Sequence, residues 1–120
     1  MIEKEFIPYE LALELKQLGF DEHCFASYYH AGRKLDICEY INHGEYTVLA
    51  PTYSQAFRWF RDKHELSSWM YNSHIDKYFY TILQDGRIVK ANESVTTYEE
   101  AELGCLKKLI EIVKTYGGNK

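Results

Sequence analysis

The stretch SSWMYNSHIDKYFYTILQDGRIVKA, residues 67–91, decides the fold that the sequence predicts. Residues 68–74 and 78–83 are rich in the aromatic and β-branched types that favour strands. Asp85-Gly86 is a two-residue hairpin signal, and the four residues after it form a short third strand. The stretch therefore predicts an antiparallel meander.

A second strand-forming region lies nearer the N-terminus. Residues 24–30 and 35–41 flank a permissive turn at Gly32, and apolar and polar positions alternate in the second of them, which is the period of a strand. This pattern predicts a hairpin. Residues 46–50 are either a further short strand or an extended lead-in to the next element.

Three helices are indicated by apolar spacing and by their ends. Residues 8–18 carry leucines at helical spacing and are followed by Gly19, which suits a left-handed cap. Residues 53–65 follow the capping-box pattern Thr52-x-x-Gln55, and a second box, Thr97-x-x-Glu100, opens the last helix before Gly117-Gly118.

The order of elements is α-β-β-(β)-α-β-β-β-α. Consecutive strands joined by hairpins predict an α+β fold with an antiparallel sheet of about five strands. We expect the three helices to pack mainly on one face, which leaves the other face partly open. The length of 120 residues fits one domain spanning residues 1–120.

Composition excludes several classes of protein. The formal charge of −4 argues against a nucleic-acid binder. No apolar run reaches the length of a membrane span, and the opening MIEKEFIPYE lacks the apolar core of a secretory signal. The three cysteines are odd in number and widely spaced, so reduced thiols in a cytoplasm are expected.

No motif names a reaction. The five histidines lack helical i, i+4 pairing, no cysteine pair has metal-binding spacing, and neither a nucleophile elbow nor a phosphate loop is present. We therefore expect no catalytic residues, no metal site and no cofactor. His64 continues the apolar face of its helix, which predicts a partly buried structural residue.

Aromatic residues are in excess, with 11 tyrosines in 120 residues. Because alternate strand residues face opposite ways, strand tyrosines cannot all lie under helices on one face. At least two of them, with Trp69 or Trp59 nearby, are expected on a partly exposed surface. The candidate ligand-binding residues combine these rings with arginines, whose planar fork suits phosphate and carboxylate: Tyr28, Arg33, Arg58, Trp59, Arg61, Trp69 and Tyr71. The alternative for each is ordinary core packing or surface solvation.

Three segments resemble a known group of proteins. They are residues 50–64 (APTYSQAFRWFRDKH), residues 6–22 (FIPYELALELKQLGFDE) and residues 98–103 (YEEAEL). Together they resemble a family of small uncharacterised proteins encoded by bacteriophages and prophage regions of gut-type bacteria. The resemblance implies an accessory phage gene active in the bacterial cytoplasm, for which counter-defence is a common role, but it implies no catalytic residue.

Two functions follow as hypotheses. The first is a non-enzymatic binder of a small anionic or nucleotide-like ligand, with stacking on rings and arginine on phosphate, and with a pocket that could form between subunits of a homo-oligomer. The alternative is a protein-interaction module that inhibits or adapts a host protein, because Tyr, Trp and Arg dominate interface hot spots. A nucleotide hydrolase and a single-stranded nucleic-acid binder rank below both.

Overall fold

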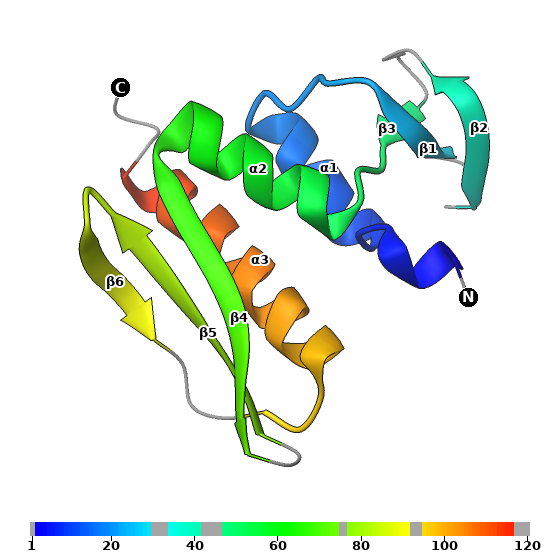
Figure 1. The fold of residues 1–120 in the computed structure, drawn as a ribbon. Coiled ribbons are helices and arrows are strands. Elements are labelled where there is room, and N and C mark those ends of the chain that lie inside the picture. Colours follow the sequence, from blue (N-terminus) through cyan, green and yellow to red (C-terminus); the bar gives the residue numbers. More distant parts are fainter. Residues whose placement is uncertain (1, 30–33, 42–46, 75–76, 92–94, 117–120) are drawn as a thin grey trace. The chain divides into compact units, whose positions relative to one another are not determined.

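The structure, a computed structural model, describes residues 2–29, 34–41, 47–74, 77–91 and 95–116. Within these residues the chain forms three α-helices and six strands, in the order that the sequence predicts (Figure 1). All strand pairs are antiparallel. The predicted α+β fold class is therefore confirmed.

The arrangement of the strands differs from the single sheet of about five strands that we expected. Six strands form two separate three-stranded sheets, one before and one after the middle helix. Each group of consecutive strands pairs locally, and the alternation of residue types along a strand does not specify which distant strand it joins. The two sheets belong to two compact units, residues 1–56 and 57–120. That the whole chain behaves as one domain stays a prediction.

The first unit holds a three-stranded sheet in the order β2-β1-β3. Residues 47–49 pair with β1, so the segment left open as strand or lead-in contains a strand. The elements of this unit are the 3-10 helix Ile2–Glu5, α1 Tyr9–Gln17, β1 Cys24–Tyr29, β2 Leu35–Ile41 and β3 Thr47–Leu49.

Helix α1 ends as its sequence predicts. Gly19 takes a φ of +100°, its N–H donates to the carbonyl of Lys16 at 3.1 Å, and the N–H of Phe20 donates to that of Leu15 at 3.0 Å. These two bonds are the Schellman pattern, which satisfies the last carbonyls of a helix. Phe20 and Leu15 are both buried, so the cap also contributes to the core.

A small cluster forms a core of the first unit. Phe6, Ala26 and Ala50 are buried together, with Tyr28 and Leu35 packed against them. The Tyr28 hydroxyl donates to the carbonyl of Ile7 at 2.8 Å, which joins β1 to the segment before α1. The cluster holds the N-terminal segment against the sheet.

Helix α2, Tyr53–His64, begins at the predicted cap. The Thr52 hydroxyl accepts from the N–H of Gln55 at 3.1 Å. The Gln55 side chain does not complete the reciprocal box; its Nε2 instead donates to the carbonyl of His23 at 2.8 Å. After His64 the chain turns at once into a strand, and Glu65 adopts a left-handed φ of +58° there.

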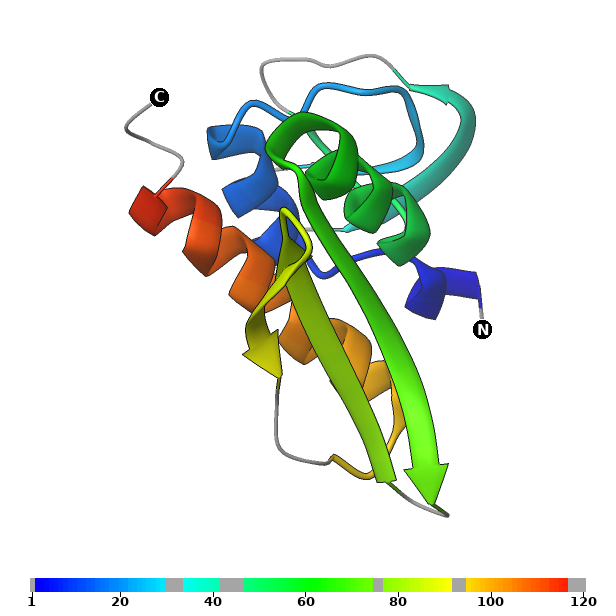
Figure 2. The same ribbon diagram turned by 60° about the vertical axis from the view of Figure 1, so that its left-hand side comes forward.

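The second unit contains the sheet β4-β5-β6 and one long helix. Its elements are β4 Leu66–His74, β5 Lys77–Gln84, β6 Arg87–Ala91 and α3 Tyr98–Tyr116. Asp85 and Gly86 join β5 to β6 with φ values of +52° and +78°, the doubly left-handed turn that Asp-Gly favours. Figures 1 and 2 show α3 lying along one face of this sheet.

The start of α3 confirms the second capping box. The Thr97 hydroxyl accepts from the N–H of Glu100 at 3.1 Å, and the Glu100 carboxylate accepts from the hydroxyls of Thr96 at 2.6 Å and Thr97 at 3.1 Å. These hydrogen bonds favour the ionised carboxylate and lower the pKa of Glu100.

Close packing between α3 and the sheet depends on a glycine. A Cβ atom on Gly104 would lie 3.3 Å from the Cε2 atom of the Tyr80 ring, so the bare backbone allows the ring to approach. The apolar stripe of α3 is buried, and it consists of Ala101, Cys105, Leu106, Leu109, Ile110 and Val113. One face of the second sheet is therefore covered by α3.

Candidate functional site

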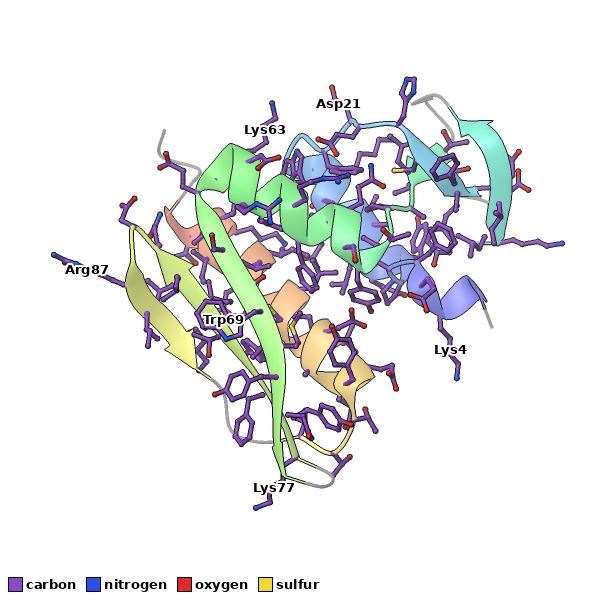
Figure 3. All side chains as sticks on the ribbon, viewed as in Figure 1. Lys4, Asp21, Lys63, Trp69, Lys77 and Arg87 are labelled. Carbon is purple, nitrogen blue, oxygen red and sulfur yellow. The ribbon has the colours of Figure 1, made fainter. Side chains whose placement is uncertain are left out.

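The strand register of the second sheet defines its two faces. Trp69 pairs with Thr81 and Tyr71 pairs with Phe79, so these residues share a face. The residues between them, including Met70 and its partner Tyr80, face α3, as the contact between Tyr80 and Gly104 demonstrates. Trp69 and Tyr71 therefore lie on the face opposite α3. Figure 3 shows Trp69 in front of the sheet with α3 behind it.

The edge strand β6 extends the same face. Ile88 pairs with Leu83, which in turn pairs with Ser67, two residues before Trp69 on β4. Ile88 is 66% exposed, Trp69 44% and Tyr71 42%. These three side chains and Phe79 are named the open aromatic face.

Two rings of the open aromatic face are ordered by direct contact. Tyr71 and Phe79 stack with ring centroids 5.2 Å apart and an interplanar angle of 15°. The stacked pair lies across two neighbouring strands, beside Trp69, which is two residues from Tyr71 along β4. The three rings therefore lie near one another on one face, since the pairing of the two strands fixes their positions.

The other tyrosines of this sheet lie on the α3 side. Tyr80 is 7% exposed, and burial raises the pKa of its hydroxyl. Tyr78 packs edge-on against Tyr98 of α3, with ring centroids 6.2 Å apart. The open aromatic face thus contains one of the three tyrosines of this sheet, where we expected at least two, and Phe79 supplies the ring that stacks on Tyr71.

Trp59, a candidate for the partly exposed surface, lies in the interior instead. It is 4% exposed, and its ring packs edge-on against Phe60 at 5.0 Å and His64 at 4.9 Å. Trp59 is in ring contact with the fully buried Phe60, so the indole is buried together with the apolar side of α2. The ring therefore offers a ligand little surface, which corrects its place among the candidate site residues. His64 is half-buried in this cluster, as predicted.

The arginines of α2 are exposed on either side of this buried ring. Arg58 and Arg61 both face solvent, and the Nε of Arg61 lies 3.6 Å from a carboxylate oxygen of Asp62. An exposed pair of this length contributes little to stability. Arg58 and Arg61 therefore do not flank an accessible ring on which a ligand could stack.

The remaining candidate residues belong to the first unit. Tyr28 is half-buried, its hydroxyl is engaged by the carbonyl of Ile7, and burial together with the nearby Glu10 raises its pKa. Arg33 lies outside the described residues. Of the predicted residues, the structure brings Trp69 and Tyr71 together on one surface.

Three residues of this region were missed by sequence reasoning. Phe79 and Ile88 join the open aromatic face through the register of β5 with its two neighbours. Lys77 lies two positions before Phe79 on β5, so it occupies the end of the same face, and it is exposed. A two-residue turn at Asp85-Gly86 pairs Leu83 with Ile88, so the sequence could have placed Ile88 on the same face as Leu83.

A pocket lies on the other side of β6. It has a volume of about 390 Å³ and is lined by residues of the sheet and of the C-terminal half of α3: Gln84, Val89, Lys108, Glu111, Ile112 and Thr115. Lys108 and Glu111 form an ion pair at 3.0 Å within it. The wall is thus mixed, with Val89 and Ile112 apolar and the ion pair on the helix.

The buried thiols are poor candidates for chemistry. Burial, reinforced by the Glu22 carboxylate, raises the pKa of Cys24 to about 12, and burial raises that of Cys105 to about 12. A thiol is reactive as its thiolate, so both are inert at neutral pH. In the part of the chain that the structure describes, no three His, Cys, Asp or Glu side chains group as metal ligands, and no helix is long and apolar enough to cross a membrane.

Comparison of the chain with protein-family models, with curated proteins and with solved structures gave no match.

Proposed function

We propose that this protein is a non-enzymatic interaction module that binds another protein through the open aromatic face. The observation that carries the proposal is the exposure of Trp69, Tyr71 and Ile88 on one sheet face while α3 covers the other. Contiguous exposed apolar patches mark interaction sites in proteins that fold in water. Trp and Tyr are also the residues most enriched at hot spots.

The geometry favours a protein partner over the nucleotide-like ligand that the sequence also suggested. A nucleotide site needs cations placed to meet phosphate beside the stacking ring. Arg58 and Arg61 lie on α2 and flank the buried Trp59, and among the described side chains the cation on the open aromatic face is Lys77, at its end. A broad apolar face with a charge at its border is the usual plan of a protein interface.

The biological setting is part of the same proposal and rests on the resemblance of residues 6–22, 50–64 and 98–103 to phage and prophage proteins. In that setting the partner is a protein of the bacterial host, and binding it would inhibit or adapt it, for example in counter-defence. The site of action would be the host cytoplasm.

The rings set the expected strength of the interaction. Truncating a buried aromatic anchor at the centre of an interface typically costs 2 kcal/mol or more, which is about a 30-fold loss of affinity. Trp69 is the best such anchor because it is the largest exposed side chain and lies on β4, the strand that also carries Tyr71.

The proposal is tested by affinity capture from a lysate of a gut-type bacterium with the wild-type chain and the Trp69→Thr variant. We expect one stoichiometric host protein with the wild type and an affinity lowered about 30-fold with the variant. The matched control is Phe25→Thr, which removes another exposed strand aromatic from the first sheet. Equal retention by Trp69→Thr and the wild type would contradict the proposal.

A nucleotide panel separates the two hypotheses. Thermal unfolding of the wild type and of Trp69→Thr is compared with and without each nucleotide. We expect no shift. A shift that Trp69→Thr abolishes would return the function to the binding of a nucleotide-like ligand, with the ring as its stacking platform.

A further inference from the structure

Strand β6 is an edge strand with apolar side chains on both sides. It pairs with β5, and along its other edge the described residues place no further strand. Ile88 is 66% exposed on the open aromatic face, and Val89, 45% exposed, lines the pocket on the side of α3. Such an edge presents backbone N–H and C=O groups together with apolar contacts on either side, which is a template for an added strand.

The pocket beside β6 could accept side chains of an added strand on the side of α3. It lies between β6 and the C-terminal half of α3, with Val89 and Ile112 in its wall, and its volume is about 390 Å³. One water molecule takes roughly 30 Å³ in the liquid, so the space is large enough for a side chain. In strand addition, main-chain bonds supply affinity and such pockets accept alternate side chains and supply specificity.

The charges on β6 select the added strand. The strand contains Arg87 and Lys90 and no acidic residue, while Asp85 lies outside it in the turn. Among the described residues neither cation forms an ion pair, whereas Lys108 is already paired with Glu111. Figure 3 shows Arg87 directed outward from the sheet. An edge of this kind attracts carboxylates.

The same charges disfavour a second copy of this chain. Antiparallel pairing of β6 with another β6 would gather four cations in a short ladder without an acidic residue in either strand. Like charges on neighbouring strands destabilise pairing, and lysine on an edge strand is a common device against self-association.

We propose that β6 binds an extended acidic segment of the partner protein, which adds as a fourth strand to the sheet β4-β5-β6. One set of its alternating side chains extends the open aromatic face beyond Ile88, and the other set faces the pocket beside Val89. Carboxylates of the segment meet Arg87 and Lys90. The inference rests on the proposed function for the identity of the partner as a protein, and it adds the chemistry of the segment.

Two synthetic decapeptides test this inference, one alternating isoleucine with glutamate and the other alternating isoleucine with lysine. We expect the acidic peptide to bind the full chain on the order of tenfold more tightly than the basic one, because charge complementarity selects the partner. In the variant Arg87→Glu/Lys90→Glu we expect the preference to reverse. Reversal cannot be produced by a variant that fails to fold. Equal binding of the two peptides to the wild type would overturn the proposal.

Hydrogen exchange locates the added strand. With the acidic peptide we expect slower amide exchange across Arg87–Ala91 and unchanged exchange along Leu66–His74, the other edge. Protection of the β4 edge instead would overturn the choice of β6. Protection of Arg87–Ala91 that grows with protein concentration in the absence of peptide would overturn the choice of an acidic partner in favour of a second copy.

The failure of this inference is distinguishable from failure of the proposed function. If Trp69→Thr loses the captured host protein while Arg87→Glu/Lys90→Glu retains it, the open aromatic face is the interface and strand addition is wrong. If the charge variant loses the host protein while Trp69→Thr retains it, the edge binds without the face and the proposed function is wrong.

Discussion

The two sheets of this protein have the same number of strands and the same antiparallel pairing, yet they present different surfaces. In the first sheet, Phe25 is 65% exposed and Tyr29 48%, and neither ring contacts another aromatic ring among the described residues. In the second, Tyr71 stacks on Phe79 across two strands beside Trp69. An aromatic surface therefore depends on register between strands more than on the number of rings.

The backing of the two sheets differs as well. A cluster centred on Phe6, Ala26 and Ala50 supports the first sheet. The second lies against α3, a helix of 19 residues whose apolar stripe is buried along its length. A binding surface loses less conformational entropy on binding when it is already rigid. The second sheet is therefore the better platform, and the predictions below test this contrast.

The largest expected effect is on the reactivity of the two buried thiols, one in each unit. In a Cys38→Ser variant, the remaining cysteines that a thiol reagent can label are Cys24 and Cys105. A rise in pKa from 9.0 to about 12 leaves roughly a thousandfold less thiolate at pH 8. We expect labelling at least that much slower than in the unfolded chain, with Cys105 slower than Cys24 because Cys105 is fully buried on the apolar stripe of the long helix α3. Mass spectrometry of digested samples follows each site.

The same shifts give a dependence of stability on pH. Both thiols have a pKa raised by folding, so their contribution to the free energy of unfolding is complete below the ordinary value of 9.0 and is lost as pH rises toward about 12.

In the labelling experiment, equal rates at Cys24 and Cys105 would indicate that both units open together, which would break the contrast between them.

A smaller effect is expected from truncation within α3. Leu106→Ala should lower the free energy of unfolding by about 2–5 kcal/mol, since Leu106 is fully buried. The matched control is Ile88→Ala, which shortens an exposed aliphatic side chain and should cost less than about 0.5 kcal/mol. Urea unfolding followed by circular dichroism measures both. Similar losses for the two variants would mean that Ile88 is covered in solution.

The smallest effect concerns the anchor of the first sheet. Tyr28→Phe removes the hydroxyl that donates to the carbonyl of Ile7 and should cost about 1 kcal/mol. Tyr29→Phe, on the next residue of β1, removes an exposed hydroxyl and should be close to neutral. Thermal unfolding of both variants provides the test, and a neutral Tyr28→Phe would show that the bond does not hold the N-terminal segment.

Much of the fold could be predicted from the sequence because its signals are local. Gly19, Thr52, Thr97 and the Asp85-Gly86 turn each act within a few residues, and each is found in its predicted conformation. The division into two sheets could not be predicted in this way, because strand pairing across α2 is a matter of long-range packing that no local pattern reports.

The candidate site was predicted only in part, for a similar reason. The alternation of β4 placed Trp69 and Tyr71 on one face, but their neighbours Phe79 and Ile88 required the registers of two hairpins. Trp59 failed as a candidate because exposure on a short helix depends on what covers it, and its position between two arginines gave no sign of burial.

The irregularity between β5 and β6 has a consequence for how this surface can change. Leu83 pairs with Ile88 and Ile82 pairs with Lys90, so β6 contains one extra residue, Val89, at this point. Because of that residue, Lys90 lies on the side of α3 and Ala91 pairs with Thr81. If the same residues paired without this irregularity, Val89 would stand opposite Ile82 and Lys90 opposite Thr81, the partner of Trp69. A shift of one residue in the register of β6, with no substitution anywhere, would thus place an ammonium group beside the rings, and the register of the strand is itself a determinant of what the protein can bind.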